Sequence, residues 1–229
     1  MKSIFFIGYI IFFLSQTMNA QSGKLFFELN YNTFTQTSLK NFQEEFKNDV
    51  SEIPIQTNDD FPGNFGFSLG YELVDKNVLI FGSYNTTGGK LSYSDYSGIV
   101  RITEELKGYT FGAEYLIPFS KTDNNFTLGL RGFGMFTTMN LENYYQISES
   151  VSQDGIEFQS VNLGLGARVL YEYPISFFII RASVGFDLTF GGSLTFKENS
   201  DFHLEDNNGD KVKTNWTGLR TGIGIAIPF

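Results

Sequence analysis

Apolar and polar side chains alternate along most of this chain with a period of two. The pattern is clearest over residues 219–229, where every second side chain is apolar or Thr and the run finishes on Phe229. The positions between carry Gly, Ala, Pro or the single Arg220. A period of two indicates a β-strand with one bulky apolar face and one small or polar face. A strand that finishes on an exposed aromatic suits a lipid-facing wall better than a soluble surface.

The same alternation occurs seven more times upstream. It predicts strands at residues 25–36, 64–74, 78–87, 106–119, 125–138, 157–173, 176–190 and 216–229. The connections alternate between short turns, at 75–77, 120–124 and 174–175, and long loops, at 37–63, 88–105, 139–156 and 191–215. We therefore expect an all-β fold, an eight-stranded antiparallel up-and-down transmembrane β-barrel with short periplasmic turns and long extracellular loops.

Alternation alone does not distinguish a membrane barrel from a soluble barrel whose apolar face points inward. The apolar face here is too rich in large aromatic side chains to fit inside eight strands. The other face carries Gly, Ser, Thr, Asn and isolated charges instead of the dense Lys and Glu of a soluble surface. Aromatic residues also gather near strand ends, as an interfacial girdle requires; they are Tyr31, Tyr71, Tyr84, Tyr109, Tyr115, Tyr171, Tyr173 and Trp216. We therefore place the apolar face outward.

The first twenty of the 229 residues have the pattern of a secretory signal peptide. Lys2 supplies a positive charge, residues 4–14 are apolar, and Ala20 is a small residue suited to cleavage. Residues 21–229 would then form the barrel domain. Loss of Lys2 leaves 15 basic residues against 25 acidic ones, which argues against nucleic acid as a partner. The absence of Cys from the sequence excludes disulfides, thiol chemistry and Cys-based metal sites.

These features resemble the eight-stranded outer-membrane β-barrel family that includes OmpA-type transmembrane domains and OmpX-like proteins. The resemblance covers essentially all of residues 21–229, in architecture rather than through one motif. The family ends in a signal read by the barrel-assembly machinery, in which Gly224 and Phe229 fit, while Ile227 stands where an aromatic is usual and Gly222 where a polar residue is usual. The content of Phe, Tyr and Asn is similar to that of Bacteroidetes barrels. The resemblance implies a Gram-negative outer membrane, with its lipids and lipopolysaccharide and the assembly machinery as partners.

The inward face of the predicted barrel carries charges of both signs. They are Glu28, Glu72, Glu114, Arg131, Arg168, Glu172, Arg181, Asp187 and Arg220. An isolated charge in a narrow lumen is costly, so we expect them to pair, with Arg181 reaching Arg168 and Glu172 across a hairpin. The pairs predict a lumen filled by a salt-bridge network; the alternative is a narrow, porin-like polar pore.

Little in the sequence favours catalysis or a metal. The single His, His203, lies in the last long loop near Ser200, Asp201 and Glu205, but catalysis needs a nucleophile and base in contact. Residues 206–210 have the oxygen-rich character of a calcium loop but lack its Gly and its closing Glu, and they favour a tight turn instead. We expect no enzyme activity, no metal and no cofactor, with a lipid-modifying enzyme as the less favoured alternative.

The first long loop contains Leu39, Phe42 and Phe46 at helical spacing, which predicts a short amphipathic helix. Such a helix would cap the barrel mouth, meet a partner, or pack on the barrel's own loops. We therefore expect a structural or interaction role through extracellular loops. The other interpretation is an accessory subunit of a transport or secretion complex, and the sequence identifies no protein partner.

Overall fold

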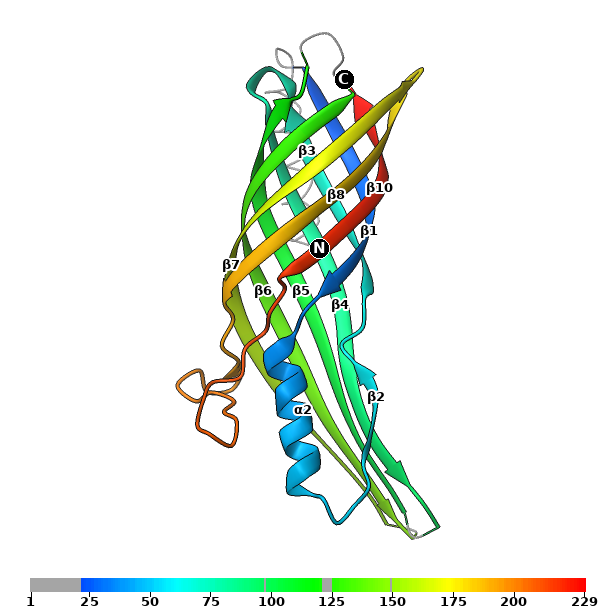
Figure 1. Cartoon of the computed structure of the whole chain (residues 1–229), viewed down its shortest axis with the longest axis vertical. Coiled ribbons are helices and arrows are strands. Elements are labelled where there is room, and N and C mark those ends of the chain that lie inside the picture. Colours follow the sequence, from blue (N-terminus) through cyan, green and yellow to red (C-terminus); the bar gives the residue numbers. More distant parts are fainter. Residues whose placement is uncertain (1–21, 97, 121–124, 149) are drawn as a thin grey trace, which may run out of the picture.

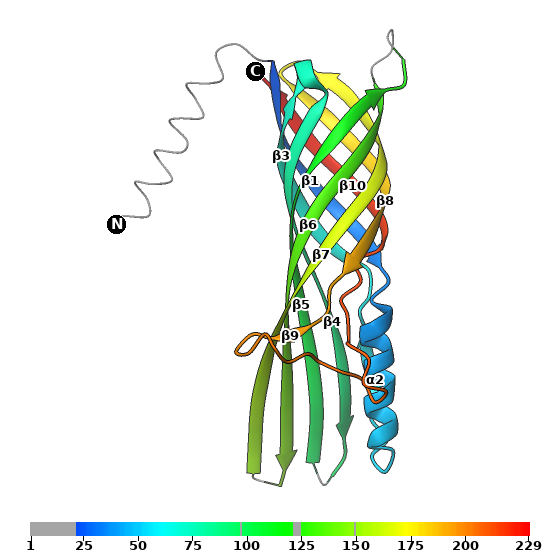
Figure 2. The same cartoon turned by 90° about the vertical axis from the view of Figure 1, so that its left-hand side faces the viewer.

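The computed structural model describes residues 22–96, 98–120, 125–148 and 150–229, and the predicted signal peptide lies outside these described residues. Eight strands form a closed antiparallel ring (Figures 1 and 2). In chain order they are β1 (Gly23–Phe34), β3 (Asn64–Leu73), β4 (Val78–Ser94), β5 (Gly98–Pro118), β6 (Phe126–Ile147), β7 (Ser150–Ile175), β8 (Phe178–Gly191) and β10 (Gly218–Pro228). The eight predicted strands and the antiparallel barrel are confirmed.

The ring closes because β1 pairs on both of its edges. One edge pairs with β3 and the other with β10, from Lys24 opposite Pro228 to Phe34 opposite Gly218. At the turn rim, Gly23 and Phe229 donate backbone hydrogen bonds to each other at 3.1 and 3.0 Å. Closure satisfies the edge hydrogen-bonding groups that an open sheet would leave unpaired. Both ends of the described domain therefore lie at the rim with the short turns.

Four neighbouring strands are much longer than the other four. β1, β3, β8 and β10 have 12, 10, 14 and 11 residues, whereas β4, β5, β6 and β7 have 17, 21, 22 and 26. The long strands run past the ring as a twisted sheet, which we call the extension (Figure 2). The prediction of long loops at 88–105 and 139–156 is wrong, because both segments are mostly strand. The strands of the extension were missed because we looked for an apolar outward face, and the outward face of these strands is polar.

Smaller elements pack against the extension. The helix α2 (Thr37–Asp49) follows β1, as predicted, and runs along the extension away from the barrel (Figures 1 and 2). The strand β2 (Gln56–Asp60) pairs with β4, and the short strand β9 (Thr195–Phe196) pairs with β7. The predicted tight turn is present: Gly209 has φ +79°, and its N–H donates to the carbonyl of Asp206 at 3.0 Å. A 3₁₀ turn, η1 (Val74–Lys76), joins β3 to β4.

The polarity of both faces inverts along single strands, and β5 shows it best. In the extension its inward residues Ile102 and Leu106 are apolar and buried, while the outward Lys107 is charged. In the barrel its inward Glu114 is 2% exposed, while the outward Phe111 is 71% exposed. The inward parity does not change between the two parts. What changes between the two parts is which face carries the polar side chains and which carries the apolar ones.

No helix of the described residues is both long and apolar enough to cross a membrane.

Candidate functional site in the lumen and at the barrel mouth

All nine charged side chains predicted for the lumen face the inside of the ring. Eight of them are buried and Glu172 is partly buried. They come from seven of the eight ring strands, because each strand presents its small or polar face inward. Together with their partners, they form three groups of ion pairs.

The first group is centred on Arg168 of β7. Its Nε donates to Oε1 of Glu114 at 2.8 Å, and its Nη1 lies 3.3 Å from Glu28. The hydroxyl of Ser183 also donates to Glu28 at 2.9 Å. Two carboxylates therefore share one guanidinium near the middle of the lumen, and this group carries one net negative charge.

The second group has the opposite balance. Asp187 accepts from Nη2 of Arg220 at 2.7 Å and lies 3.6 Å from Nε of Arg131. The guanidinium of Arg131 lies over the ring of Phe81 at 4.1 Å and that of Phe133 at 5.1 Å. Charge–quadrupole attraction of this kind strengthens when water is excluded. This group carries one net positive charge and complements the first.

The third group lies towards the turn rim and contains a residue that the sequence analysis missed. Lys24 reaches Glu72 at 3.1 Å and Glu172 at 2.7 Å, and Arg181 lies 3.2 Å from Glu172 and 3.8 Å from Glu72. Arg181 also lies over the ring of Phe26 at 4.6 Å. The same-face alternation of β1 was the available signal for Lys24. The expected approach of Arg181 to Glu172 is present, whereas Arg168 pairs elsewhere.

With Lys24 included, the lumen holds five acidic and five basic side chains, so its charges balance. Buried charges are tolerated when each is paired and hydrogen-bonded. Breaking one pair would leave an uncompensated charge in a low-dielectric interior, which is costly. The ten side chains therefore have to be considered as one unit.

Apolar side chains fill the lumen between and beyond the ion pairs, which the sequence analysis did not anticipate. They include Phe26, Leu79, Phe81, Leu116, Phe133 and Leu170, all buried. Trp216, predicted for the outer girdle, is also inside: it is 1% exposed and donates from Nε1 to Oγ1 of Thr137 at 3.0 Å. An indole that finds a hydrogen-bond partner can be buried without penalty. The lumen is thus packed with ionic and aromatic side chains.

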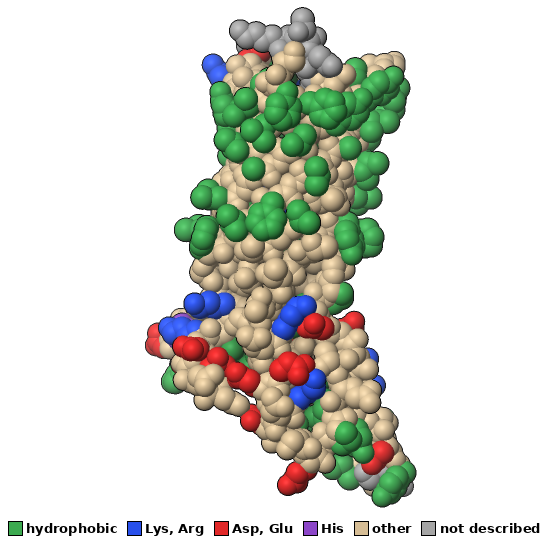
Figure 3. All heavy atoms as spheres, viewed as in Figure 1, with side chains coloured by type: hydrophobic (Ala, Val, Ile, Leu, Met, Phe, Trp, Pro, Cys, Tyr) green, Lys and Arg blue, Asp and Glu red, His purple; other side chains and the backbone are tan. Residues whose placement is uncertain are grey.

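The outer wall is the reverse of the lumen. Figure 3 shows hydrophobic side chains in two bands around the barrel, with charged side chains gathered beyond the second band, toward the extension. Aromatic contacts join neighbouring strands on this wall. Near the extension, the ring centroid of Tyr84 lies 5.6 Å from that of Phe67 and 5.3 Å from that of Tyr109. At the turn rim, the ring centroids of Tyr71 and Phe229 are 5.8 Å apart. Large aromatics on a wall that lacks charges are typical of contact with lipid.

At the mouth of the barrel, α2 packs against the inner side of the extension. Leu39 is fully buried in the cluster that contains Trp216 and Leu106. One turn further, Gln43 is 1% exposed and donates from Nε2 to Oε2 of Glu104 at 2.5 Å. Burial raises the pKa of Glu104 to about 7, and the hydrogen bond from Gln43 opposes this shift only in part. Neither residue was singled out from the sequence.

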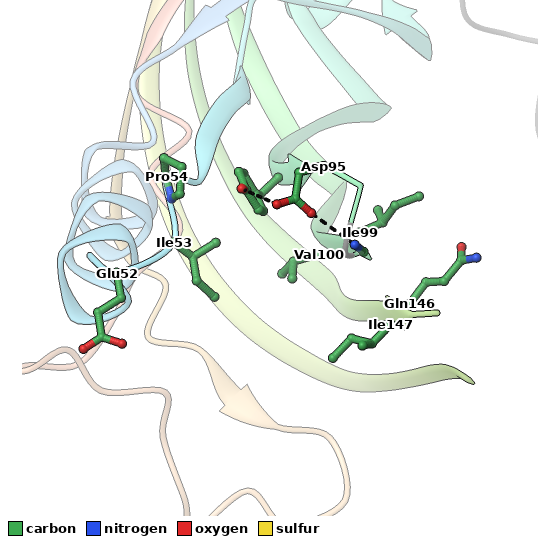
Figure 4. A pocket seen from close by; sticks show the side chains of 10 residues that line it. Glu52, Ile53, Pro54, Asp95, Ile99, Val100, Gln146 and Ile147 are labelled. Carbon is green, nitrogen blue, oxygen red and sulfur yellow. Dashed lines mark hydrogen bonds between the residues drawn. The ribbon is translucent and has the colours of Figure 1, made fainter. Parts of the chain in front are cut away.

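A pocket of about 320 Å³ lies at the far tip of the extension (Figure 4). Its walls come from the α2–β2 connection, the β4–β5 hairpin and β6, with Ile53, Val100 and Ile147 among the lining residues. The carboxylate of Asp95 accepts from the hydroxyl of Tyr93 at 2.9 Å and from the backbone of Gly98 at 3.1 Å. Asp95 therefore closes the hairpin.

Of the three residues of the predicted assembly signal, Ile227 and Phe229 lie on the outer wall, whereas Gly224 lies on the inward face of β10. Ile227 and Phe229 are 46% and 54% exposed, and Gly224 pairs with Glu28 of β1. A Cβ at Gly224 would lie 2.1 Å from the carbonyl oxygen of Phe27. That close approach gives glycine a packing role here, whatever the role of the three residues in assembly.

The candidate catalytic and calcium-binding residues make other contacts. His203 has Nε2 2.8 Å from Nζ of Lys211. The carboxylate of Asp206 accepts backbone hydrogen bonds from Asn208 and Asp210 at 2.9 and 2.8 Å, which builds the hairpin turn. Among the described residues, no three His, Cys, Asp or Glu side chains come together as a metal site.

Comparisons with protein-family models and with curated proteins found no match. Among solved structures, the chain is similar to the attachment invasion locus protein Ail of Yersinia pestis, with 12% identity, 91% of this chain and 99% of that chain covered, and a TM-score of 0.37. The chain is also similar to Neisserial surface protein A, with 10% identity, 90% of this chain and 97% of that chain covered, and a TM-score of 0.37. A third similar structure is a major outer membrane protein from Thermus thermophilus, with 11% identity, 90% of this chain and 99% of that chain covered, and a TM-score of 0.42. At TM-scores below 0.5 these likenesses assign no function to the chain.

Proposed function

We propose that this chain is an integral outer-membrane β-barrel protein of a Gram-negative bacterium, non-enzymatic, with a sealed lumen and an interaction role. The observation that carries the proposal is the inversion of polarity along the long strands. On β5, Phe111 is 71% exposed on the barrel wall and Glu114 is 2% exposed inside it, whereas in the extension the buried inward residue is the apolar Ile102. A water-soluble barrel would have the reverse arrangement.

The dimensions of the barrel support a membrane position. A tilted strand needs about 9–11 residues to cross the apolar core of a bilayer. The four short strands have 10 to 14 residues and match this span, while β4–β7 exceed it at one rim only. Short turns face the periplasm in barrels of this kind, so the extension and α2 would lie outside the cell. Outer-membrane lipids and lipopolysaccharide would then surround the wall, and Gly224, Ile227 and Phe229 would serve the assembly machinery.

The packed lumen argues against a narrow pore. Ten charged side chains, paired within three groups, occupy the interior together with Phe26, Phe81 and Phe133. An eight-stranded barrel has room only for side chains in its interior. The test is conductance of the purified protein in planar lipid bilayers. We expect no steady current above that of the bilayer. Steady, reproducible channels formed by the folded monomer would contradict the sealed lumen and favour a pore.

The extension supports the interaction role. Side chains at its tip are apolar and unusually exposed, with Tyr96 102%, Ile147 66% and Val151 59% exposed. Large apolar groups on a protruding sheet are typical of sites of protein contact. Affinity purification after mild detergent extraction tests this. We expect a stoichiometric partner that is lost in the triple variant Tyr96→Ser, Ile147→Ser, Val151→Ser.

A matched control for this experiment lies on the outward face of β5. The variant Thr103→Ser, Glu105→Gln changes the extension away from its tip and is expected to retain the partner. A barrel that folds and carries no partner in any variant would remove the interaction role and leave a structural one.

A further inference from the structure

An otherwise apolar helix–sheet interface contains one buried polar pair. The inward face of the extension presents Leu91, Ile102 and Leu106, each at most 5% exposed, and α2 packs over this face. Glu104 lies between Ile102 and Leu106 on that face and is 2% exposed. Its carboxylate meets Nε2 of Gln43 at 2.5 Å, one helical turn beyond the fully buried Leu39.

Within the part of the chain that the structure describes, no cation neutralises Glu104. The residues opposite it on the neighbouring strands are Gly89 of β4 and Leu141 of β6. A Cβ at Gly89 would lie 2.0 Å from Gln43 and 2.5 Å from Glu104, so the amide and the carboxylate fill the space above that glycine. Phe61 closes the same space, at 2.9 Å from that position.

The charged groups of the surrounding elements are engaged with other partners or lie on the outward face. On α2, Lys40 pairs with Asp60 of β2 at 3.0 Å, and Lys47 pairs with Glu44 at 2.8 Å. In the extension, the further charges on β4, β5 and β6 are Lys90, Arg101, Glu105, Lys107 and Glu142, of which Glu105 and Lys107 pair with each other at 2.8 Å. Glu114 of β5 and Arg131 of β6 lie in the barrel lumen. Burial raises the pKa of Glu104, and the hydrogen bond from Gln43 lowers it only in part.

The other polar contacts of α2 are few and exposed, so they do not prevent the helix from moving away from the sheet. Ser38 accepts from the backbone of Lys213 at 3.0 Å, and near the far end Asp49 accepts from the side chain of Asn207 at 2.9 and 3.0 Å. These contacts to the 191–215 connection are exposed, and exposed polar contacts contribute little to stability. The packing of the apolar stripe, interrupted by Gln43, therefore decides whether the helix stays docked.

We propose that α2 is a pH-sensitive cover on the extension, docked over Glu104 while that buried carboxyl is protonated and loosened when it ionises without a counter-charge. A neutral carboxyl can remain buried against an amide. A carboxylate with one neutral donor loses its hydration and gains no counter-charge, so it is better accommodated when α2 moves away and admits water. Undocking would uncover the apolar face around Leu91 and Ile102 beside the barrel mouth.

The sign of the effect follows from proton linkage. The pKa of Glu104 is about 7 with α2 docked, against an ordinary value of 4.5 when the group is in water. The docked state therefore binds the extra proton, and docking weakens as the pH rises from about 4.5 to 7 and then stays constant. A difference of this size changes the docking equilibrium by roughly two orders of magnitude.

Distance measurements between two spin labels test the proposal directly, since the chain has no native Cys to compete for labelling. Labels at Asn48→Cys on α2 and Glu142→Cys on β6 report docking in detergent at pH 5.5 and pH 8.5. We expect one short distance at pH 5.5 and an added population of longer distances at pH 8.5. The variant Glu104→Gln, which imitates the protonated side chain, should give the short distance alone at both pH values.

Glu105→Gln is the matched control, because Glu105 is the exposed neighbour on the same strand; it should keep the pH response of the wild type. Retention of the folded barrel is checked by the shift in gel mobility on heating. A distance distribution that does not change with pH in the wild type, or a wild-type response in Glu104→Gln, would overturn the proposal. The proposed membrane location is not tested by these distances, so the two ideas fail separately.

Discussion

The barrel and the extension are built from the same four long strands, and comparing them shows how the surroundings select the side chains. On β5 the outward residues Glu105 and Lys107 pair with each other in the extension, whereas Tyr109 and Phe111 follow on the same face in the barrel. The inward face changes from Ile102 and Leu106 to Thr110 and Glu114 over the same interval. The pleat is continuous through Lys107–Tyr109, and only the polarity inverts.

Burial alone therefore does not determine whether the side chains of a core are apolar or charged. In the extension the buried face is mainly apolar and Glu104 is a buried charge on it, while the outward face carries charged side chains such as Arg101, Glu105 and Lys107. In the barrel the buried face combines apolar side chains with ten charges, which balance one another in three groups. The bulky apolar face is then left for lipid. A change that is harmless in one part should therefore be damaging in the other.

The largest effect is expected from breaking the central lumen group. Arg168→Met would leave Glu28 and Glu114 buried without their common cation, and we expect a loss of about 3–5 kcal/mol in the free energy of unfolding. Urea titration of the barrel folded into lipid vesicles measures it. The triple variant with Glu28→Gln and Glu114→Gln in addition should recover most of the loss. Equal stabilities of the single and triple variants would show that the pairs do not act as a unit.

A smaller effect is expected from a charge placed on the outer wall. Phe111→Lys should lower the free energy of unfolding in vesicles by about 2–4 kcal/mol, since the new ammonium would face acyl chains. Thr103→Lys, on the same face of β5 but in the extension, is the control and should change stability by less than about 0.5 kcal/mol. If both variants behaved alike, the boundary between the two regions would not be where the polarity inverts.

The smallest effect is expected at the boundary itself. Lys107 pairs with Glu105 at 2.8 Å in an exposed position. Exposed ion pairs contribute little, so Lys107→Ala should lower stability by about 0.2–1 kcal/mol, and less in high salt. Urea titration at two ionic strengths checks this. A large loss that salt does not reduce would mean that Lys107 has a structural role the geometry does not indicate.

The sequence was sufficient for the barrel because its two faces differ in every strand. The alternation located all eight strands and placed the nine charges on one face. It also indicated α2, from the spacing of Leu39, Phe42 and Phe46. These are local patterns with a fixed period, and they survive in the folded chain.

The extension, the seal and the Glu104–Gln43 contact could not be found in this way. The extension strands reverse the polarity of the barrel strands, so a rule based on an apolar outward face assigned them to loops. Trp216 lies near a strand end, which suggested the outer girdle, although the period of two places it on the same face as the inward Arg220. Gln43 and Glu104 are 61 residues apart in the chain, and their contact depends on how α2 docks.

The most direct test of the inverted polarity is an accessibility scan along β5 in lipid vesicles. Single spin labels replace outward residues one at a time at Thr103, Glu105, Lys107, Tyr109, Phe111, Ala113 and Tyr115, and relaxation is measured with oxygen and with a water-soluble nickel complex. We predict nickel-accessible labels up to Lys107 and oxygen-accessible labels from Tyr109 onward, with the switch between those two residues. Labels accessible to nickel along the whole strand would contradict the account, because the barrel wall would then face water.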